Sequence, residues 1–109
     1  MGDVLGVFEQ AVLVGVVQLR GEGYGRTILE EVQARLARDV AASAVYATLD
    51  RLEDKGLVRS RDGKATPERG GRAKRHFSIT LAGVRALNDS KAAANNIWRG
   101  LSWPLKEPS

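Results

Sequence analysis

The 109-residue sequence predicts a mainly α-helical fold with a small β-hairpin. Three segments with the apolar spacing of amphipathic helices come first, and two short strand-like segments around a basic, glycine-rich stretch follow them. A fourth helical segment comes last. This order is that of a winged helix-turn-helix followed by a C-terminal helix. The length suits one domain, and the absence of cysteine excludes disulfides and thiolate metal sites.

The first three helices are expected at Val4–Arg20, Arg26–Arg38 and Ala42–Lys55, with the short connector Asp39–Ala41 between the last two. The second half of Val4–Arg20 is apolar nearly all round, which indicates burial on more than one side. In so small a chain, another subunit is expected to supply the second covering surface. Gly56 is well placed to end the third helix in a left-handed conformation.

A wing is expected from two strands, Leu57–Arg61 and Lys74–Thr80, joined by the glycine-rich tip Asp62–Ala73. Between Arg59 and His76 there are seven Lys and Arg residues against two acidic ones. That segment carries a net charge of +5 and the rest of the chain −1, within a total of +4. Charge gathered in one place is typical of a protein that binds a polyanion, although a solvated loop is the alternative interpretation.

The last helix is expected at Leu81–Leu101, with Thr80 as its N-cap. Its apolar residues recur at steps of three and four, in the pattern of a coiled-coil seam that Lys91 interrupts. The predicted domains are a winged helix-turn-helix DNA-binding domain at residues 1–80, a dimerisation helix at 81–103 and a tail at 104–109.

The third helix, over Ser43–Lys55, has the character of a DNA recognition helix. Its expected outward face consists of Ser43, Ala44, Ala47, Thr48 and Arg51. Small and hydroxylated residues let a helix approach base edges closely, and an arginine can bind guanine with two hydrogen bonds. An ordinary amphipathic helix would show a similar polar face. The basic hairpin that directly follows this helix favours the interpretation that it binds DNA.

Several motifs together resemble the PadR family of bacterial transcriptional regulators. They are Gly23-Tyr24-Gly25, Ser43–Glu53 with Lys55–Val58, and Gly70–Thr80 with Ala82-Gly83. The similarity spans about Val12 to Leu87 and points to the short branch, in which one helix follows the wing. It implies a homodimer, usually a repressor, that binds an inverted repeat in double-stranded DNA and dimerises through its first and last helices.

The sequence departs from the family pattern at two places. Glu22 stands where many members have a histidine. Ser43-Ala44 stands near the position at which a Gly-Thr pair commonly opens the recognition helix in the family. A contact made by that histidine is therefore not carried over to this chain, and a different base preference is expected.

Three sets of site residues follow from the pattern and the resemblance. The DNA-binding candidates are Tyr24, Ser43, Tyr46, Thr48, Arg51, Lys64, Arg72, Lys74 and Arg75. The dimer-interface candidates are Phe8, Val12, Val84, Leu87, Ala94, Trp98 and Leu101. Trp98 is also a candidate for binding a small planar aromatic effector between subunits. The alternatives are a core role for the Tyr46 ring, mere solubility for the wing cations and simple dimer packing for Trp98.

Enzymatic, metal and membrane functions find little support in the sequence. Gly63-Lys64-Ala65-Thr66 lacks the first glycine of a phosphate-binding loop, since Val58 stands at that position. His76 is the only histidine, so neither a catalytic constellation nor a metal site is expected. No cofactor is expected. The longest apolar run, Ala11–Val17, is too short to span a membrane, and we expect a cytoplasmic protein. The competing hypothesis is a winged-helix module that binds proteins and not DNA.

Overall fold

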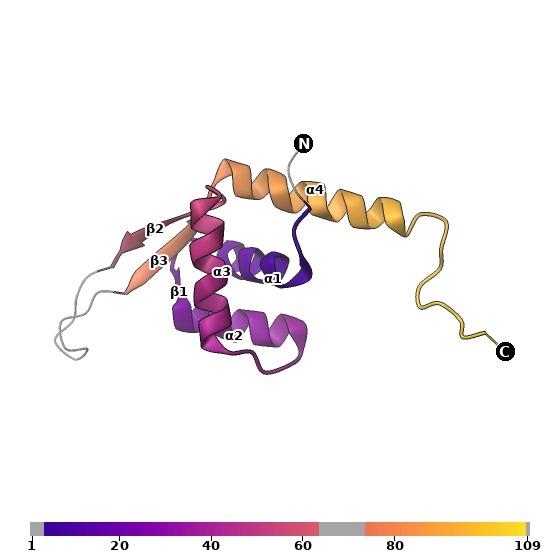
Figure 1. Cartoon of the computed structure of the whole chain (residues 1–109), viewed down its shortest axis with the longest axis horizontal. Coiled ribbons are helices and arrows are strands. Elements are labelled where there is room, and N and C mark those ends of the chain that lie inside the picture. The colour runs from indigo at the N-terminus through magenta and orange to yellow at the C-terminus, as the bar shows by residue number, and fades with distance from the viewer. Residues whose placement is uncertain (1–3, 64–73, 109) are drawn as a thin grey trace.

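Four helices and a small antiparallel sheet make up the computed structural model, which describes residues 4–63 and 74–108 (Figure 1). This confirms the predicted mainly α fold with a winged helix-turn-helix. The elements in chain order are α1 (Val7–Gln18), β1 (Gly23–Tyr24), α2 (Gly25–Leu36), α3 (Ala42–Asp54), β2 (Val58–Asp62), β3 (Arg75–Ile79) and α4 (Leu81–Ile97).

Helix α1 lies at the centre of the fold and contacts α2, α3, β3 and α4. Val12 and Leu13 are completely buried, and Val16 is nearly so. The subunit itself therefore covers much of the apolar surface of α1, whereas Val17 near its C-terminal end is 44% exposed. Val12, expected at a dimer interface, belongs instead to the core of the subunit.

The sheet has the strand order β1-β3-β2, and both pairs are antiparallel. The wing hairpin β2–β3 is as expected, with Ser60 opposite Phe77. Strand β1 lies between the first two predicted helices, where the sequence analysis places no strand. Its two residues pair with Phe77 and His76 of β3, and a strand this short shows no apolar alternation by which a sequence could reveal it.

The ends of α3 and α4 are defined by local chemistry. Gly56 adopts a φ of 76°, and the N–H of Leu57 donates to the carbonyl of Leu52, which closes α3 as expected for a helix-ending glycine. The hydroxyl of Thr80 accepts a hydrogen bond from the N–H of Gly83 at 3.1 Å and caps α4. Helix α4 ends at Ile97, four residues before the expected end, because the chain turns at Gly100 with a φ of 83°.

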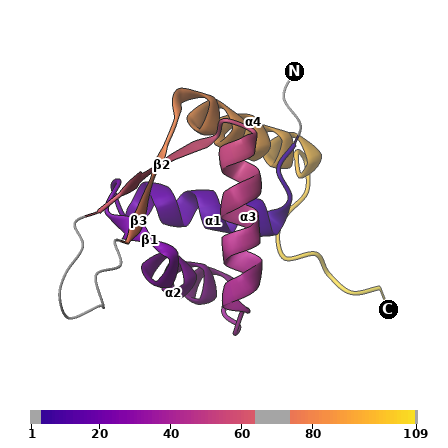
Figure 2. The ribbon, with the colours of Figure 1, turned by 60° about the vertical axis from the view of Figure 1, so that its left-hand side comes forward.

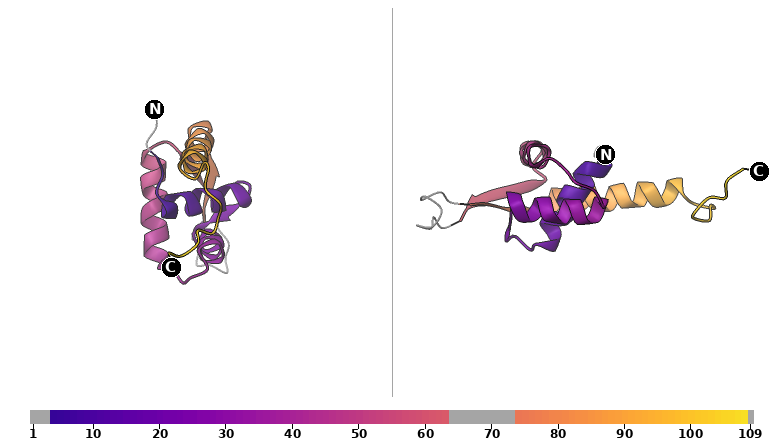
Figure 3. Two further views of the ribbon diagram at one scale, coloured as in Figure 1. Left: turned by 90° about the vertical axis from the view of Figure 1, so that its right-hand side faces the viewer. Right: turned by 90° about the horizontal axis from the view of Figure 1, so that it is seen from below.

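The wing and the C-terminal half of α4 point to opposite ends of the molecule (Figure 3). Helix α3 stands across α1, with α2 beside its N-terminal half (Figure 2). The recognition helix and the wing thus lie on one part of the molecule and the free part of α4 on another.

Candidate nucleic-acid interface

Helix α3 buries one face and leaves the other open. Val45, Leu49 and Leu52 are essentially fully buried, at one turn or two turns from one another, and pack into the core with α1 and α2. Ser43 lies in the first turn and is exposed, as are Ala44, Ala47 and Arg51. The exposed entry to the helix is therefore made of small residues, as the sequence predicts.

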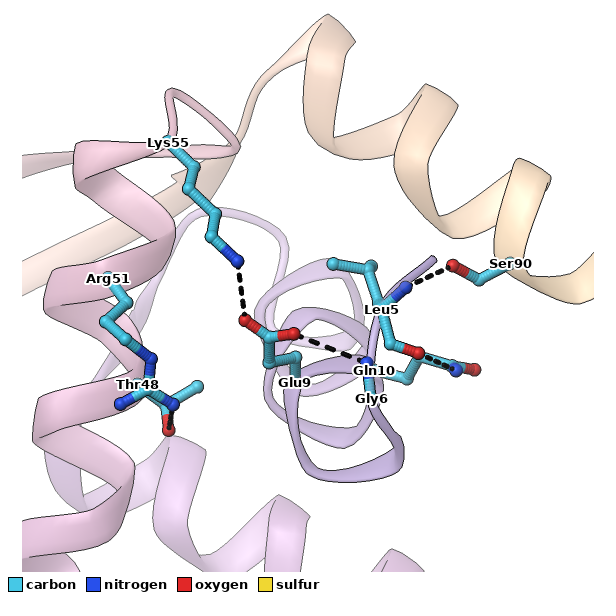
Figure 4. Close-up of polar contacts among 8 residues, drawn as sticks. All are labelled: Leu5, Gly6, Glu9, Gln10, Thr48, Arg51, Lys55 and Ser90. Carbon is cyan, nitrogen blue, oxygen red and sulfur yellow. Dashed lines mark hydrogen bonds and ion pairs between the residues drawn. The ribbon is translucent and has the colours of Figure 1, made fainter. Parts of the chain in front are cut away.

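Thr48 does not lie on the outward face. Its side chain is only 2% exposed, and its hydroxyl accepts a hydrogen bond from the guanidinium of Arg51 at 3.0 Å (Figure 4). The helical twist turns position 48 toward the core beside Val45 and Leu49. Thr48, predicted to contact DNA, is therefore buried, and its hydroxyl is bonded to Arg51, one turn further along the helix.

The C-terminal end of α3 is tied to α1 by an ion pair. The ammonium of Lys55 lies 3.0 Å from a carboxylate oxygen of Glu9, whose side chain is 18% exposed (Figure 4). The other carboxylate oxygen accepts from the N–H of Gly6 at 3.3 Å. Burial raises the pKa of Glu9, but the hydrogen bonds from Lys55 and Gly6 and the charges of Lys55 and Arg51 outweigh it, so that the pKa falls below 4.5.

Helix α4 is tied to the segment before α1 at a buried point. The N–H of Leu5 donates to the hydroxyl of Ser90 at 3.1 Å, and both residues are buried (Figure 4). The carbonyl of Leu5 accepts from the Gln10 side chain at 2.8 Å. Because Gly6 follows directly and binds Glu9, a short series of polar contacts joins α4 to the end of α3.

The root of the wing is joined to α3 by Arg75. Its guanidinium forms ion pairs with Asp50, at 3.3 Å, and with Glu53, and it donates to the hydroxyl of Ser60 at 3.1 Å. Ser60 in turn donates to Glu53 at 2.5 Å. Arg75, predicted to contact DNA, therefore makes its described contacts with the recognition helix and with the neighbouring strand.

A groove of about 450 Å³ lies between the start of α2, α3 and β3. It is lined by Tyr24, Gly25, Arg26, Tyr46, Leu49, Asp50, Lys74, Arg75 and Phe77. The ammonium of Lys74 lies 3.9 Å from the centre of the Tyr24 ring, and His76 meets the same ring edge-on. A Cβ at Gly25 would overlap the ring of Tyr46, which explains the glycine at this position.

The structure thus brings four predicted DNA contacts, Tyr24, Tyr46, Lys74 and Arg75, to one groove. Tyr46 is 50% exposed, so its ring is not a core ring. Lys64 and Arg72 lie outside the described residues. Arg26 was missed by the sequence analysis, although a cation in the first turn after Gly-Tyr-Gly could have indicated it. Its exposed side chain pairs with Glu30 at 3.4 Å.

The candidates for the dimer interface fall into two groups. Phe8 and Leu87 are partly buried against the core. Val84, Ala94, Trp98 and Leu101 are exposed, the two larger side chains Trp98 and Leu101 by 43% and 56%. Further apolar side chains that the sequence analysis did not select share this exposure; they are Leu81, Ile97, Trp103 and Leu105. Trp98 is not among the residues that line the groove between α2, α3 and β3.

None of the helices in residues 4–63 and 74–108 combines the length and the hydropathy needed to cross a membrane. A comparison with curated proteins found no match.

Solved structures of similar proteins share the fold. A PadR family regulator from Eggerthella lenta is 25% identical with a TM-score of 0.65, over 82% of this chain and 75% of that one. A PadR-like regulator from Bacillus cereus is 22% identical with a TM-score of 0.64, over 87% and 94%. F93 from STIV, a winged-helix DNA-binding protein, is 14% identical with a TM-score of 0.69, over 92% and 100%.

The model of the PadR-like transcriptional regulator family matches residues 13–89, which is well over half of the chain. The match includes α2, α3, both wing strands and the first half of α4. The chain therefore belongs to the PadR-like family of transcriptional regulators, and it is a winged-helix DNA-binding regulator and not an enzyme.

Proposed function

We propose that the protein is a homodimeric repressor that binds an inverted-repeat operator in the cytoplasm. The observation that carries this proposal is the junction of α3 with the wing, where a helix with an open face of small residues contacts strands that carry Arg59, Arg61 and Arg75. Ser43 and Arg51 are the proposed base-reading residues. Tyr24, Tyr46 and Lys74, together with Arg26, are the proposed phosphate contacts.

The dimer is proposed to form through α4 and the exposed ends of α1. Val4 and Val7, at 67% and 72% exposed, lie at the start of α1, and apolar residues of α4 are exposed as well. Residues 1–80 then form the DNA-binding part, 81–103 the dimerisation part and 104–109 a tail. A two-fold axis would place two α3 helices in successive major grooves, about 34 Å apart.

Selection of bound sequences from random double-stranded DNA tests this function. We expect an inverted repeat whose half-sites are about one helical turn apart, and a binding constant that falls steeply with salt, because Lys and Arg contacts displace counterions. Enrichment of no sequence, together with binding that is insensitive to salt, would show that the chain is a protein-interaction module and not a repressor.

We further propose that a small aromatic compound releases the repressor by binding between subunits near Trp98. The proposal is supported by the exposure of this ring on the proposed dimer face. Replacement of Trp103, which is 79% exposed, by phenylalanine leaves Trp98 as the only fluorescent indole. Titration with phenols and planar cations should then quench Trp98 and weaken binding to the selected DNA. Quenching without any change in DNA affinity would exclude the regulatory role.

A further inference from the structure

Arg75 uses all three of its guanidinium nitrogens within the subunit. Nη1 pairs with Asp50, Nη2 with Glu53, and Nε donates to Ser60. The same guanidinium lies 5.1 Å from the centre of the Phe77 ring, which is buried beneath the wing. A planar guanidinium can satisfy several acceptors in fixed directions, which an ammonium cannot.

The contacts of Arg75 bridge two parts of the proposed DNA surface. Asp50 and Glu53 lie one turn apart on α3, whereas Ser60 and Arg75 lie on the two strands of the wing. Asp50 is 65% exposed beside residues that we propose to meet phosphates. Two carboxylates at this place would repel DNA if no cation were held against them.

We propose that Arg75 is a positioning residue. It fixes the wing against the recognition helix, offsets part of the negative charge of Asp50 and Glu53, and does not bind a phosphate itself. This inference rests on the proposed DNA binding and reassigns one residue of it. Its closest counterpart is Arg59, an exposed residue of β2 opposite Ser78 for which the described part of the chain shows no ion pair.

The proposal predicts how DNA binding by variants of Arg75 depends on salt. The slope of log K against log salt is negative, and loss of a phosphate contact makes it shallower by about 0.9 for each phosphate. Arg75→Gln should weaken binding to the selected duplex about 10-fold while the slope stays within about 0.3 of wild type, since the wing loses its anchor and no phosphate contact disappears. Arg75→Lys should weaken binding nearly as much, because it keeps the charge but loses the planar fork.

A double-mutant cycle tests whether the carboxylates are the partners. Asp50→Asn combined with Glu53→Gln removes the negative charge from α3. In the Arg75→Gln background this change should restore binding at least about threefold more than it improves binding in wild type. Equal gains in both backgrounds would show a general effect of charge and would count against the proposal.

Hydrogen exchange of the free protein keeps this test separate from DNA binding. Amides of residues 58–62 and 75–79 should exchange faster in Arg75→Gln and at the wild-type rate in Arg59→Gln. If the wild type bound no DNA, the proposed function would fail, and the exchange rates would still show whether Arg75 holds the wing. Full affinity in Arg75→Lys with unchanged exchange, or a slope reduced by about one in Arg75→Gln with an additive cycle, would overturn the proposal.

Discussion

Helices α3 and α4 differ in how their own subunit covers them. Helix α3 buries four of its 13 residues, and it is held at its end by Lys55 to Glu9 and along its side by Arg75. Helix α4 is longer, with 17 residues, but buries only Gly83 and Ser90. Both lie in its first ten residues, whereas its last residue, Ile97, is exposed, as are Trp98 and Leu101 just beyond the helix.

The contrast shows which helix is complete within one subunit. A helix that reads DNA must hold its angle before it meets the groove, and its own subunit supplies every described contact that fixes that angle. A helix with a row of exposed apolar side chains is incomplete, since such surface is costly to leave in water. This difference is the physical basis for proposing that α3 recognises DNA and that α4 forms the dimer.

The largest effect is expected from charges on the open face of α4. The double variant Val84→Lys and Trp98→Lys should shift the protein from dimer to monomer, because two cations cannot be buried against an apolar partner surface. Binding to the selected duplex should weaken about 100-fold, since two half-sites would no longer be held by one molecule. Sedimentation and anisotropy measure the two changes.

Asn95→Lys provides the matched control, since it adds a cation to an exposed polar position of the same helix. It should leave the oligomeric state unchanged. A wild-type protein that sediments as a monomer would contradict the proposed dimer, and a double variant that remains dimeric would place the dimer contact elsewhere.

The attachment of α4 to the rest of the subunit depends on Gly83. A Cβ at this position would overlap the carbonyl of Leu57 and the side chain of Ile79. Because a backbone carbonyl cannot move aside easily, Gly83→Ala should lower the free energy of unfolding by about 2–4 kcal/mol. Gly6→Ala is the control, since its Cβ would meet nothing closer than Glu9 at 4.0 Å. Thermal or urea unfolding measures both variants, and an equal decrease in the free energy of unfolding for the two would show that a Cβ can be accommodated at Gly83.

Elements with a long periodic pattern were predictable from the sequence. Residues 42–54 repeat their apolar positions over three turns and end at a glycine, so that α3 was placed to within one residue. The two wing strands are too short for such a repeat and were predicted as strand-like segments on either side of a glycine-rich, basic stretch. The end of α4 was not, because a seam pattern continues through Leu101 whether or not the backbone turns at Gly100.

The site was less predictable than the fold, because it depends on direction and on contacts between distant segments. Thr48 has the right residue type for a DNA contact but turns inward by the helical twist. Arg75 belongs to the basic run of the wing, yet its partners Asp50 and Glu53 lie more than twenty residues earlier. Nothing in the order of residues shows that the return strand brings them together.

The smallest effect is expected where α3 meets α1. The pKa of Glu9 in the folded protein lies below its value in the unfolded chain, so its pairing with Lys55 stabilises the fold above about pH 4.5 and ceases to do so as the pH falls through the folded pKa. Glu9→Gln should lower the free energy of unfolding by about 1 kcal/mol at pH 7. The difference from wild type should shrink as the pH falls from 5 to 3, because wild-type Glu9 then becomes neutral as well.

Glu30→Gln is the control, since it removes an ion pair whose carboxylate is 63% exposed, and its effect should be less than half as large. A Glu9→Gln difference that is the same at pH 3 and pH 7 would mean that the charge of Glu9 does not hold α3 in place.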